Sequence, residues 1–194
     1  MPKVLITDDD QKLLKMLKRT LTYENMGVLT ASNGVEALVI VRDQQPDVMI
    51  NLSASPFDYT HDEDRKATIK SNVAKYKLPL FYCNAVGSQT EIVFDGTSLV
   101  FDQDANLCGQ LPAFQAAMQS FVLNDDGASG APGLEPAGRV PDKELNPAAL
   151  EEDRNSAMVH DAIVMGIRDY FSKMGFSKAI VGSSGGIDSA VTLV

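Results

Sequence analysis

The stretch Asp47-Val-Met-Ile-Asn-Leu-Ser-Ala-Ser-Pro-Phe57 decides the fold of this chain, because one sequence pattern ends there and another begins. Its apolar start, Asp47 to Leu52, predicts a third strand, and the small residues that follow end that strand. Two strand and helix units precede the stretch, and one helix with several short strands comes after it. The sequence therefore predicts an α/β chain in which this strand joins two different halves.

Upstream of this strand, residues 1–46 alternate short apolar runs with amphipathic segments. The βαβαβ order predicts parallel strand pairing with right-handed crossovers. Asn25-Met26-Gly27 is expected to end the first helix. The expected elements are a strand at Lys3 to Thr7, a helix at Gln11 to Glu24, a strand at Val28 to Ala31 and a helix at Val35 to Arg42.

Three sequence words in this half resemble the first half of a response-regulator receiver domain. They are Val4-Leu-Ile-Thr-Asp-Asp-Asp10, Thr30-Ala-Ser-Asn-Gly-Val-Glu-Ala-Leu38 and Gln45-Pro46-Asp47. The resemblance implies that Asp8 and Asp9 hold a metal ion, Mg²⁺, beside an aspartate that accepts phosphate.

The phosphate acceptor of a receiver is missing from this sequence. Counting from Pro46, its position falls on Leu52, next to Asn51, and neither side chain can form an acyl phosphate. The alternative reading of Asp8 and Asp9 is that they are carboxylates at a helix N-terminus, with Asp10 as the cap.

Downstream of Phe57 the pattern changes to one helix and a series of strands. Thr60-x-x-Glu63 is a capping box that opens a helix reaching about Lys77. We expect the strands to form an antiparallel meander with turns at Gly87-Ser88, Asp95-Gly96 and Asp102 to Asn106. The expected strands are Leu78 to Asn84, Glu91 to Phe94, Ser98 to Phe101 and Leu107 to Gln110.

The words Asn51-Leu-Ser-Ala-Ser-Pro-Phe57, Tyr82-Cys-Asn-Ala-Val-Gly87 and Val93-Phe-Asp-Gly-Thr-Ser98 resemble the later half of the nitrilase-type glutaminase domain of glutamine-dependent NAD+ synthetase. That family hydrolyses glutamine with a Cys-Glu-Lys triad, whose three members lie upstream of the part matched here. By position, Cys83 is therefore no nucleophile. Because it lies in an apolar strand, we expect a buried, inert thiol.

The same resemblance places Ser55 and Arg65 where the family lines its glutamine pocket, and His61 replaces a lysine that usually stands between them. Arg65 would pair with the carboxylate of the substrate. Two alternatives remain open: Arg65 is a solvated side chain on an acidic helix, and His61 is simply polar surface, as is His160.

Residues 124–147 are rich in Gly, Pro, Ala and Asp without any period, which predicts a linker between residues 47–123 and residues 148–194. The last part predicts a helix from Ala148 to Lys173, with a Met-rich apolar stripe typical of a core or a dimer contact. An apolar strand at Ala179 to Gly182 is then expected to lead into Ser184-Gly-Gly-Ile-Asp-Ser189. The stripe comprises Met158, Ile163, Met165, Ile167 and Tyr170.

This glycine-rich hexapeptide would bring several backbone N–H groups together at a helix beginning near Ile187, an arrangement suited to an anion. It resembles the pyrophosphate loop of the ATP pyrophosphatase superfamily, and Gly166-Ile-Arg-Asp-Tyr170 and Lys173-Met-Gly-Phe176 continue the NAD+ synthetase resemblance. The alternative is a glycine-rich turn with no ligand. The resemblance implies that ATP phosphates and Mg²⁺ are held by Ser184, Gly185, Gly186, Asp188 and Ser189.

The formal charge of −9 argues against duplex nucleic acid or an anionic membrane as the partner, so small molecules or proteins are expected. Two cysteines, Cys83 and Cys108, without a signal-peptide pattern favour a reducing cytoplasm. No apolar stretch approaches the roughly 20 residues that span a bilayer. A homo-oligomer remains possible.

The fold class expected from these patterns and resemblances is α/β. A receiver-like βαβαβ half joins a nitrilase-like mixed sheet with helices, followed by a linker and the start of an adenine-nucleotide α-hydrolase-like α/β domain. The synthetase resemblance implies ATP-dependent amidation of deamido-NAD+ through an adenylate, with glutamine as the ammonia source.

Two further hypotheses stand beside the enzyme. A receiver-like signalling module would drive a C-terminal partner, but its phosphoacceptor is missing. Alternatively, the chain is recombined or misassembled, because Asp47-Val-Met-Ile50 suits the third strand of either parent. In either case we expect this polypeptide to lack both glutaminase and complete synthetase turnover.

Overall fold

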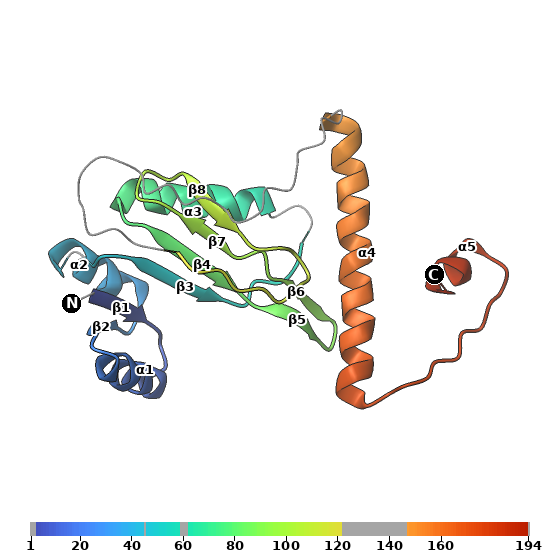
Figure 1. Cartoon of the computed structure of the whole chain (residues 1–194), viewed down its shortest axis with the longest axis horizontal. Helices are drawn as coiled ribbons and strands as arrows, with labels where there is room; N and C mark the ends of the chain where they lie inside the picture. Colours follow the sequence, from blue (N-terminus) through green and yellow to red (C-terminus); the bar gives the residue numbers. More distant parts are fainter. Residues whose placement is uncertain (1–2, 45, 59–61, 122–146, 194) are drawn as a thin grey trace.

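A computed structural model describes residues 3–44, 46–58, 62–121 and 147–193, with the side chains of the last range described from residue 155 onward. Figure 1 shows a sheet-bearing body, with one long helix standing across the end of the sheet. The elements in chain order are β1 Lys3–Thr7, α1 Gln11–Tyr23, β2 Gly27–Ala31, α2 Gly34–Gln44, β3 Met49–Ser53, α3 Asp62–Tyr76, β4 Leu80–Asn84, β5 Val86–Gln89, β6 Ile92–Asp95, β7 Leu99–Phe101, β8 Leu107–Gln110, α4 Pro147–Met174 and α5 Ile187–Leu193.

The first half forms the expected strand and helix units. β1 and β2 pair in parallel, with Val4 opposite Val28 and Ile6 opposite Thr30. Asp10 caps α1, because its carboxylate accepts hydrogen bonds from the backbone N–H groups of residues 12 and 13. The expected boundaries of these four elements are confirmed to within one or two residues.

The third strand belongs to the second half of the chain. β3 pairs with β4 in parallel along its whole length, from Met49 opposite Leu80 onward. Its link to β1 is a single parallel bridge between Val4 and Val48. β3 thus contacts strands on both sides, and nearly all of its backbone pairing lies on the downstream side.

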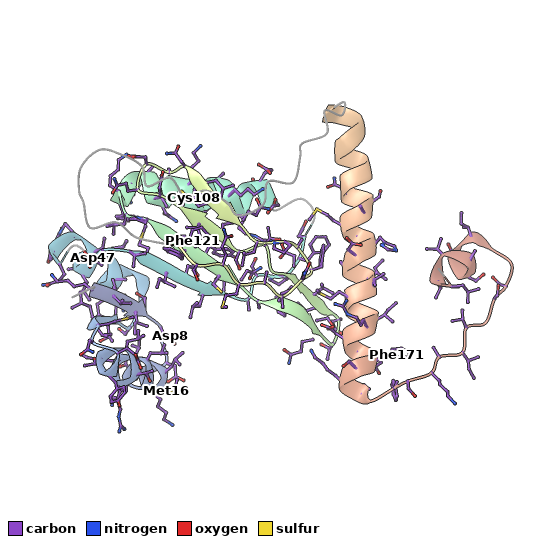
Figure 2. The ribbon with its side chains drawn as sticks, viewed as in Figure 1. Asp8, Met16, Asp47, Cys108, Phe121 and Phe171 are labelled. Atoms are coloured by element: carbon purple, nitrogen blue, oxygen red, sulfur yellow. The ribbon has the colours of Figure 1, made fainter. Side chains whose placement is uncertain are left out.

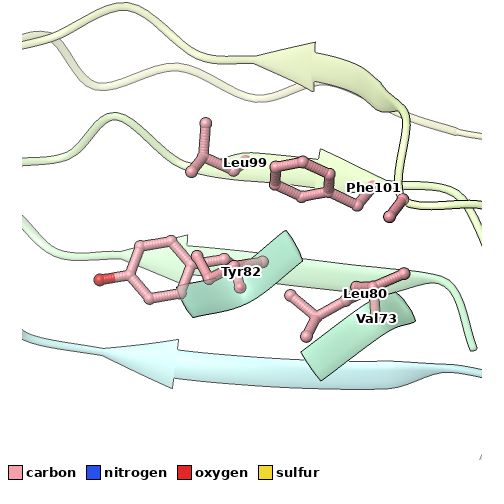
Figure 3. Packing of buried hydrophobic residues seen from close by; sticks show 7 residues of the cluster. Val73, Leu80, Tyr82, Leu99 and Phe101 are labelled. Carbon is pink, nitrogen blue, oxygen red and sulfur yellow. The ribbon is translucent and has the colours of Figure 1, made fainter. Parts of the chain in front are cut away.

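The four-stranded sheet has the order β3-β4-β7-β8 and is mixed, since β4 pairs antiparallel with β7, and β7 with β8. α3 covers one face of it (Figure 1). Figure 3 shows the cluster between the helix and the sheet, where each large apolar side chain contributes roughly 1.5–3 kcal/mol by leaving water. The cluster comprises Ile69, Val73, Leu80, Tyr82, Leu99, Phe101 and Ala105.

The opposite face of the sheet is covered at one place by the segment that follows β8. The ring of Phe121 packs edge to face on Phe81, with 5.7 Å between the ring centroids. It also lies over Gly109, where a Cβ atom would come within 2.5 Å of the ring. Glycine in β8 therefore lets the aromatic side chain approach the backbone of the sheet (Figure 2 labels Phe121).

The expected meander is wrong in one respect, because a separate hairpin lies between β4 and β7. β5 and β6 pair antiparallel around a two-residue turn, Thr90-Glu91, and form a two-stranded sheet of their own. Thr90 takes a positive φ of 54° in this turn. Such turns usually carry Gly, Asn or Asp, so the sequence lacked the signal that predicts a hairpin here.

In the last part, the expected helix is confirmed as α4, and the predicted linker, residues 124–147, lies almost entirely outside the described residues. The expected strand at Ala179 to Gly182 is wrong. This segment pairs with no strand of the described chain, and Ile180 is fully exposed at 102%. A strand is stable only beside a partner that takes up its backbone hydrogen bonds. In the described part of the chain, no helix is both long and apolar enough to traverse a bilayer.

Candidate functional site

Arg65 on α3 and Asp95 at the end of β6 form a buried ion pair. The Nη1 atom of Arg65 lies 3.3 and 3.2 Å from the two carboxylate oxygens of Asp95, and Nη2 lies 3.3 Å from Oδ1. The two side chains are 9% and 2% exposed. Arg65 is therefore not the solvated side chain of the alternative reading.

Asn84, the last residue of β4, connects this ion pair to Ser55. Its Nδ2 atom donates to Asp95 Oδ1 and to the carbonyl oxygen of Ser55, each at 3.3 Å. Its Oδ1 atom accepts a hydrogen bond of 2.8 Å from the backbone N–H of Ser55. We call Ser55, Asn84, Asp95 and Arg65 the buried network. It brings together the two residues that the sequence assigned to one pocket.

Asn84 and Asp95 were not singled out as site residues by the sequence analysis, although both lie in words that carried the family resemblance. Their meeting depends on the hairpin, since β5 begins just after Asn84 and β6 ends at Asp95. The sequence signal that could have identified Asn84 is a polar residue at the end of a predicted strand, followed by small residues.

Tight contacts with α4 hold the hairpin. The backbone N–H of Ser88 on β5 donates to Asp169 Oδ2 at 2.8 Å, and the carbonyl oxygen of Ser88 accepts from Lys173 Nζ. The Ser88 hydroxyl lies 3.4 Å from the carbonyl oxygen of Gly166. Beside them, Gly87 has a φ of 126°, and a Cβ atom there would lie 3.2 Å from the Asp169 carboxylate. We call Ser88, Asp169 and Lys173 the helix clamp.

The expected phosphate loop is an exposed turn that leads into α5, which begins at Ile187 as predicted. The hydroxyl of Ser189 donates to the carbonyl oxygen of Gly186 at 2.9 Å and lies 3.4 Å from the Ser184 hydroxyl. Gly185 has a φ of 83°, and a Cβ atom there would meet nothing within 4 Å. The loop therefore has open space around its backbone.

The acidic residues after β1 behave as the helix-terminus alternative predicts. Asp8 Oδ1 accepts the backbone N–H of Asp10 at 2.8 Å, and Asp10 caps α1. Within the described ranges, no three His, Cys, Asp or Glu side chains gather in a way that would hold a metal ion. The geometry thus gives Asp8 and Asp9 no third ligand from those ranges.

The expectation of a buried Cys83 is wrong, because this thiol is exposed. Side chains alternate along β4, so Tyr82 and Asn84 point into the core while Cys83 points to the other face. Cys108 on β8 is half-buried, and burial followed by the nearby Asp102 charge raises the pKa of its thiol.

The apolar stripe of α4 is divided between core and surface. Met165 is buried, while Ile163, Ile167 and Tyr170 are each about half exposed. Tyr170 also contacts Phe176 edge to face, with ring centroids 6.1 Å apart. This part of α4 therefore has exposed apolar side chains in addition to the residues of the helix clamp.

Comparison with known proteins matches both the loop and the network regions. A sequence model of the NAD synthase family matches residues 159–194, which include the second half of α4 and the whole Ser184 to Ser189 loop. The glutamine-dependent NAD(+) synthetase of Synechocystis sp. is 33% identical over 159 residues, which is 81% of this chain. The chain is related to glutamine-dependent NAD+ synthetases. The NAD(+) synthetase of Rhodobacter capsulatus is 36% identical over 148 residues, or 76% of this chain.

The solved structure of glutamine-dependent NAD+ synthetase from Acinetobacter baumannii, in complex with ADP, matches 98% of this chain with a TM-score of 0.57 and 25% identity. The chain spans about a quarter of the length of the two NAD+ synthetases, 26% and 25%, and 30% of the solved chain. The chain therefore matches only part of each of these relatives.

Proposed function

We propose that this chain carries part of a glutamine-dependent NAD+ synthetase that works in the cytoplasm. In that reaction ATP activates deamido-NAD+ as an adenylate, and ammonia released from glutamine then displaces AMP. The observation that carries the proposal is the family match over residues 159–194, which contains the glycine-rich loop and follows a region also similar to these synthetases. The partners are then small molecules, namely ATP, deamido-NAD+ and glutamine.

The ATP site of this proposal is the loop from Ser184 to Ser189. Ser184, Gly185, Gly186, Asp188 and Ser189 would hold the phosphates, and Asp188 would help to hold their Mg²⁺. The open surroundings of Gly185 and its positive φ support this assignment, because a phosphate needs close access to backbone N–H groups. The bound Mg²⁺ would supply neutralisation of the phosphate charge.

The glutamine pocket of this proposal includes Ser55 and Arg65. Their membership of one buried network supports it, since Ser55 is hydrogen-bonded to Asn84, Arg65 to Asp95, and Asn84 to Asp95. Arg65 would bind the substrate carboxylate, and Ser55 would line the pocket beside it.

The proposed domain boundaries are 1–46, 47–123, 124–147 and 148–194. The change of sequence pattern at Asp47 supports a seam near residue 46. The pairing of β3 with β4 supports the same seam. We do not adopt the signalling alternative, because Leu52 stands at the receiver acceptor position and carries no carboxylate.

Nucleotide binding tests the proposal directly. The full chain is titrated with MgATP, and Gly185→Val is expected to abolish the binding seen for the unchanged chain. Gly175→Val is the matched control, because Gly175 also has a positive φ, 70°, and open surroundings, but ends α4 outside the loop. Equal loss in both variants, or no loss in either, would contradict the proposed ATP site.

A further inference from the structure

We propose that Asp95 and Asn84 are positioning residues of the glutamine pocket, with Asp95 orienting the guanidinium of Arg65 and Asn84 fixing the backbone of Ser55. This inference rests on the function proposed above. It assigns a role to two side chains that contact the pocket residues rather than the substrate itself.

The argument begins with charge. The Arg65 side chain is 9% exposed, so its guanidinium loses most of its hydration, and a cation in that state needs a partner of opposite charge. Asp95 supplies it from a side chain that is 2% exposed, within 3.2–3.3 Å of both terminal nitrogens. The two charges therefore cancel within the pair, and the guanidinium of Arg65 is fixed in one orientation.

The contacts leave one side of the guanidinium available. The hydrogen bonds to Asp95 use Nη1 and Nη2, and Nε of Arg65 makes no hydrogen bond to any part of the chain that the structure describes. Nε and the second proton of Nη2 form the other edge of the planar fork, which matches a carboxylate with two parallel hydrogen bonds. The ligand group that fits this edge is a carboxylate, which L-glutamine carries.

Asn84 connects this ion pair to the backbone of Ser55. Its hydrogen bonds allow only one orientation of the side-chain amide. Its oxygen accepts from the Ser55 N–H, while its nitrogen donates to the Ser55 carbonyl and to Asp95 Oδ1. A flipped amide would place its oxygen against two acceptors and its nitrogen against a donor. The backbone N–H of Asn84 donates to the Ser98 hydroxyl at 3.0 Å, which ties the end of β4 to the residue before β7.

The test uses the Nε–Hε signal of Arg65 in the full chain, observed by NMR and identified by its loss in Arg65→Lys. In the unchanged chain the Arg65 side chain is held by Asp95 at 9% exposure, so we expect its burial to slow Hε exchange, and we expect the signal to shift on addition of L-glutamine. In Asp95→Asn we expect Hε exchange at least about tenfold faster and glutamine affinity at least about tenfold weaker, as loss of a charged hydrogen-bond partner implies. Asp43→Asn, from the exposed pair of Arg42 and Asp43, is the control and should change neither.

The outcomes separate the two ideas. If Asp95→Asn leaves Hε exchange as it is in the unchanged chain, the positioning role is wrong. If exchange rises but L-glutamine never shifts the signal in the unchanged chain, the orienting role of Asp95 stands and the proposed pocket fails. Should Asp95→Asn not fold, Asn84→Ala replaces it: exchange of the Ser55 N–H should rise at least about tenfold, and an unchanged rate overturns the inference.

Discussion

At the scale of single residues, the molecule contrasts two ion pairs of similar length and opposite surroundings. Arg65 and Asp95 lie in the interior, whereas Arg42 and Asp43 face solvent with side chains 78% and 51% exposed. Water screens the second pair and has little access to the first. Removing one partner should therefore lower the stability of the fold strongly at the interior pair and hardly at all at the exposed pair.

Asp95→Ala is expected to lower the free energy of unfolding by about 3–5 kcal/mol, because it leaves the buried guanidinium of Arg65 without a counter-charge. Asp43→Ala should change it by less than about 0.5 kcal/mol. Urea denaturation of the three proteins measures both values. Similar costs for the two substitutions would show that the interior pair is hydrated in solution.

The two cysteines should differ in reactivity. Cys83 is exposed on β4, while burial and the charge of Asp102 raise the pKa of Cys108 and so lower its thiolate fraction at a given pH. We expect iodoacetamide at pH 8 to modify Cys83 first, as followed by mass spectrometry of peptides. In 6 M guanidinium chloride the difference should disappear, and a faster Cys108 in the folded chain would refute the assignment.

At the scale of elements, the hairpin of β5 and β6 depends on α4. A two-stranded hairpin is marginal on its own, and the helix clamp takes up both the N–H and the carbonyl of Ser88, a residue only 4% exposed. The same hairpin carries Asp95 at its far end. The position of α4 is thus connected to the buried network through one hairpin.

Asp169→Ala should destabilise the chain by about 1–3 kcal/mol, because it leaves the buried N–H of Ser88 unpaired. Amide exchange at Ser88 should become faster than in the unchanged chain. Asp161→Ala is the control on the same helix, since Asp161 contacts only His160 among the described residues and is exposed. The clamp would be dismissed if both variants had the same Ser88 exchange rate.

The sequence predicted an element correctly where the residues of that element alone indicate its structure. The cap Asp10 and an apolar stripe indicate α1, and an apolar run indicates β3, so both predictions were correct. The hairpin was missed because Thr90 occupies its turn in place of Gly or Asn. The strand at Ala179 to Gly182 was wrong, because strand formation requires a partner that a local pattern does not reveal.

The same distinction explains why only part of the candidate site could be predicted from the sequence. Ser55 and Arg65 followed from sequence words, and the structure does bring them into one network. Asp95 and Asn84 were missed as their partners, because that pairing exists only once the hairpin returns the chain to the end of β4.

At the scale of the whole molecule, two halves that resemble different families meet where β1 lies beside β3. The strands follow one another as β2-β1-β3-β4-β7-β8, with the Val4 to Val48 bridge and a 2.8 Å hydrogen bond from Lys3 N to the Asp47 carboxylate at the seam. β1 thereby covers part of the edge that β3 would otherwise expose.

Turnover is the prediction that belongs to this scale. The 194-residue chain spans about a quarter of the length of its relatives, so we expect no NAD+ from deamido-NAD+, MgATP and glutamine. Chromatography of the reaction mixture measures this. A parallel reaction with ammonium chloride in place of glutamine separates the synthetase step from glutaminase. NAD+ above the level without protein would contradict the expectation.

The seam also sets how the molecule should respond to mechanical force. If the chain is stretched between its ends, the load on the N-terminal piece passes through one backbone bridge at Val48 and the Lys3 to Asp47 hydrogen bond. The load between β3 and β4 is shared by a ladder that runs from Met49 to Ser53. The piece made of β1, β2 and their helices should therefore detach first, while the four-stranded sheet still holds.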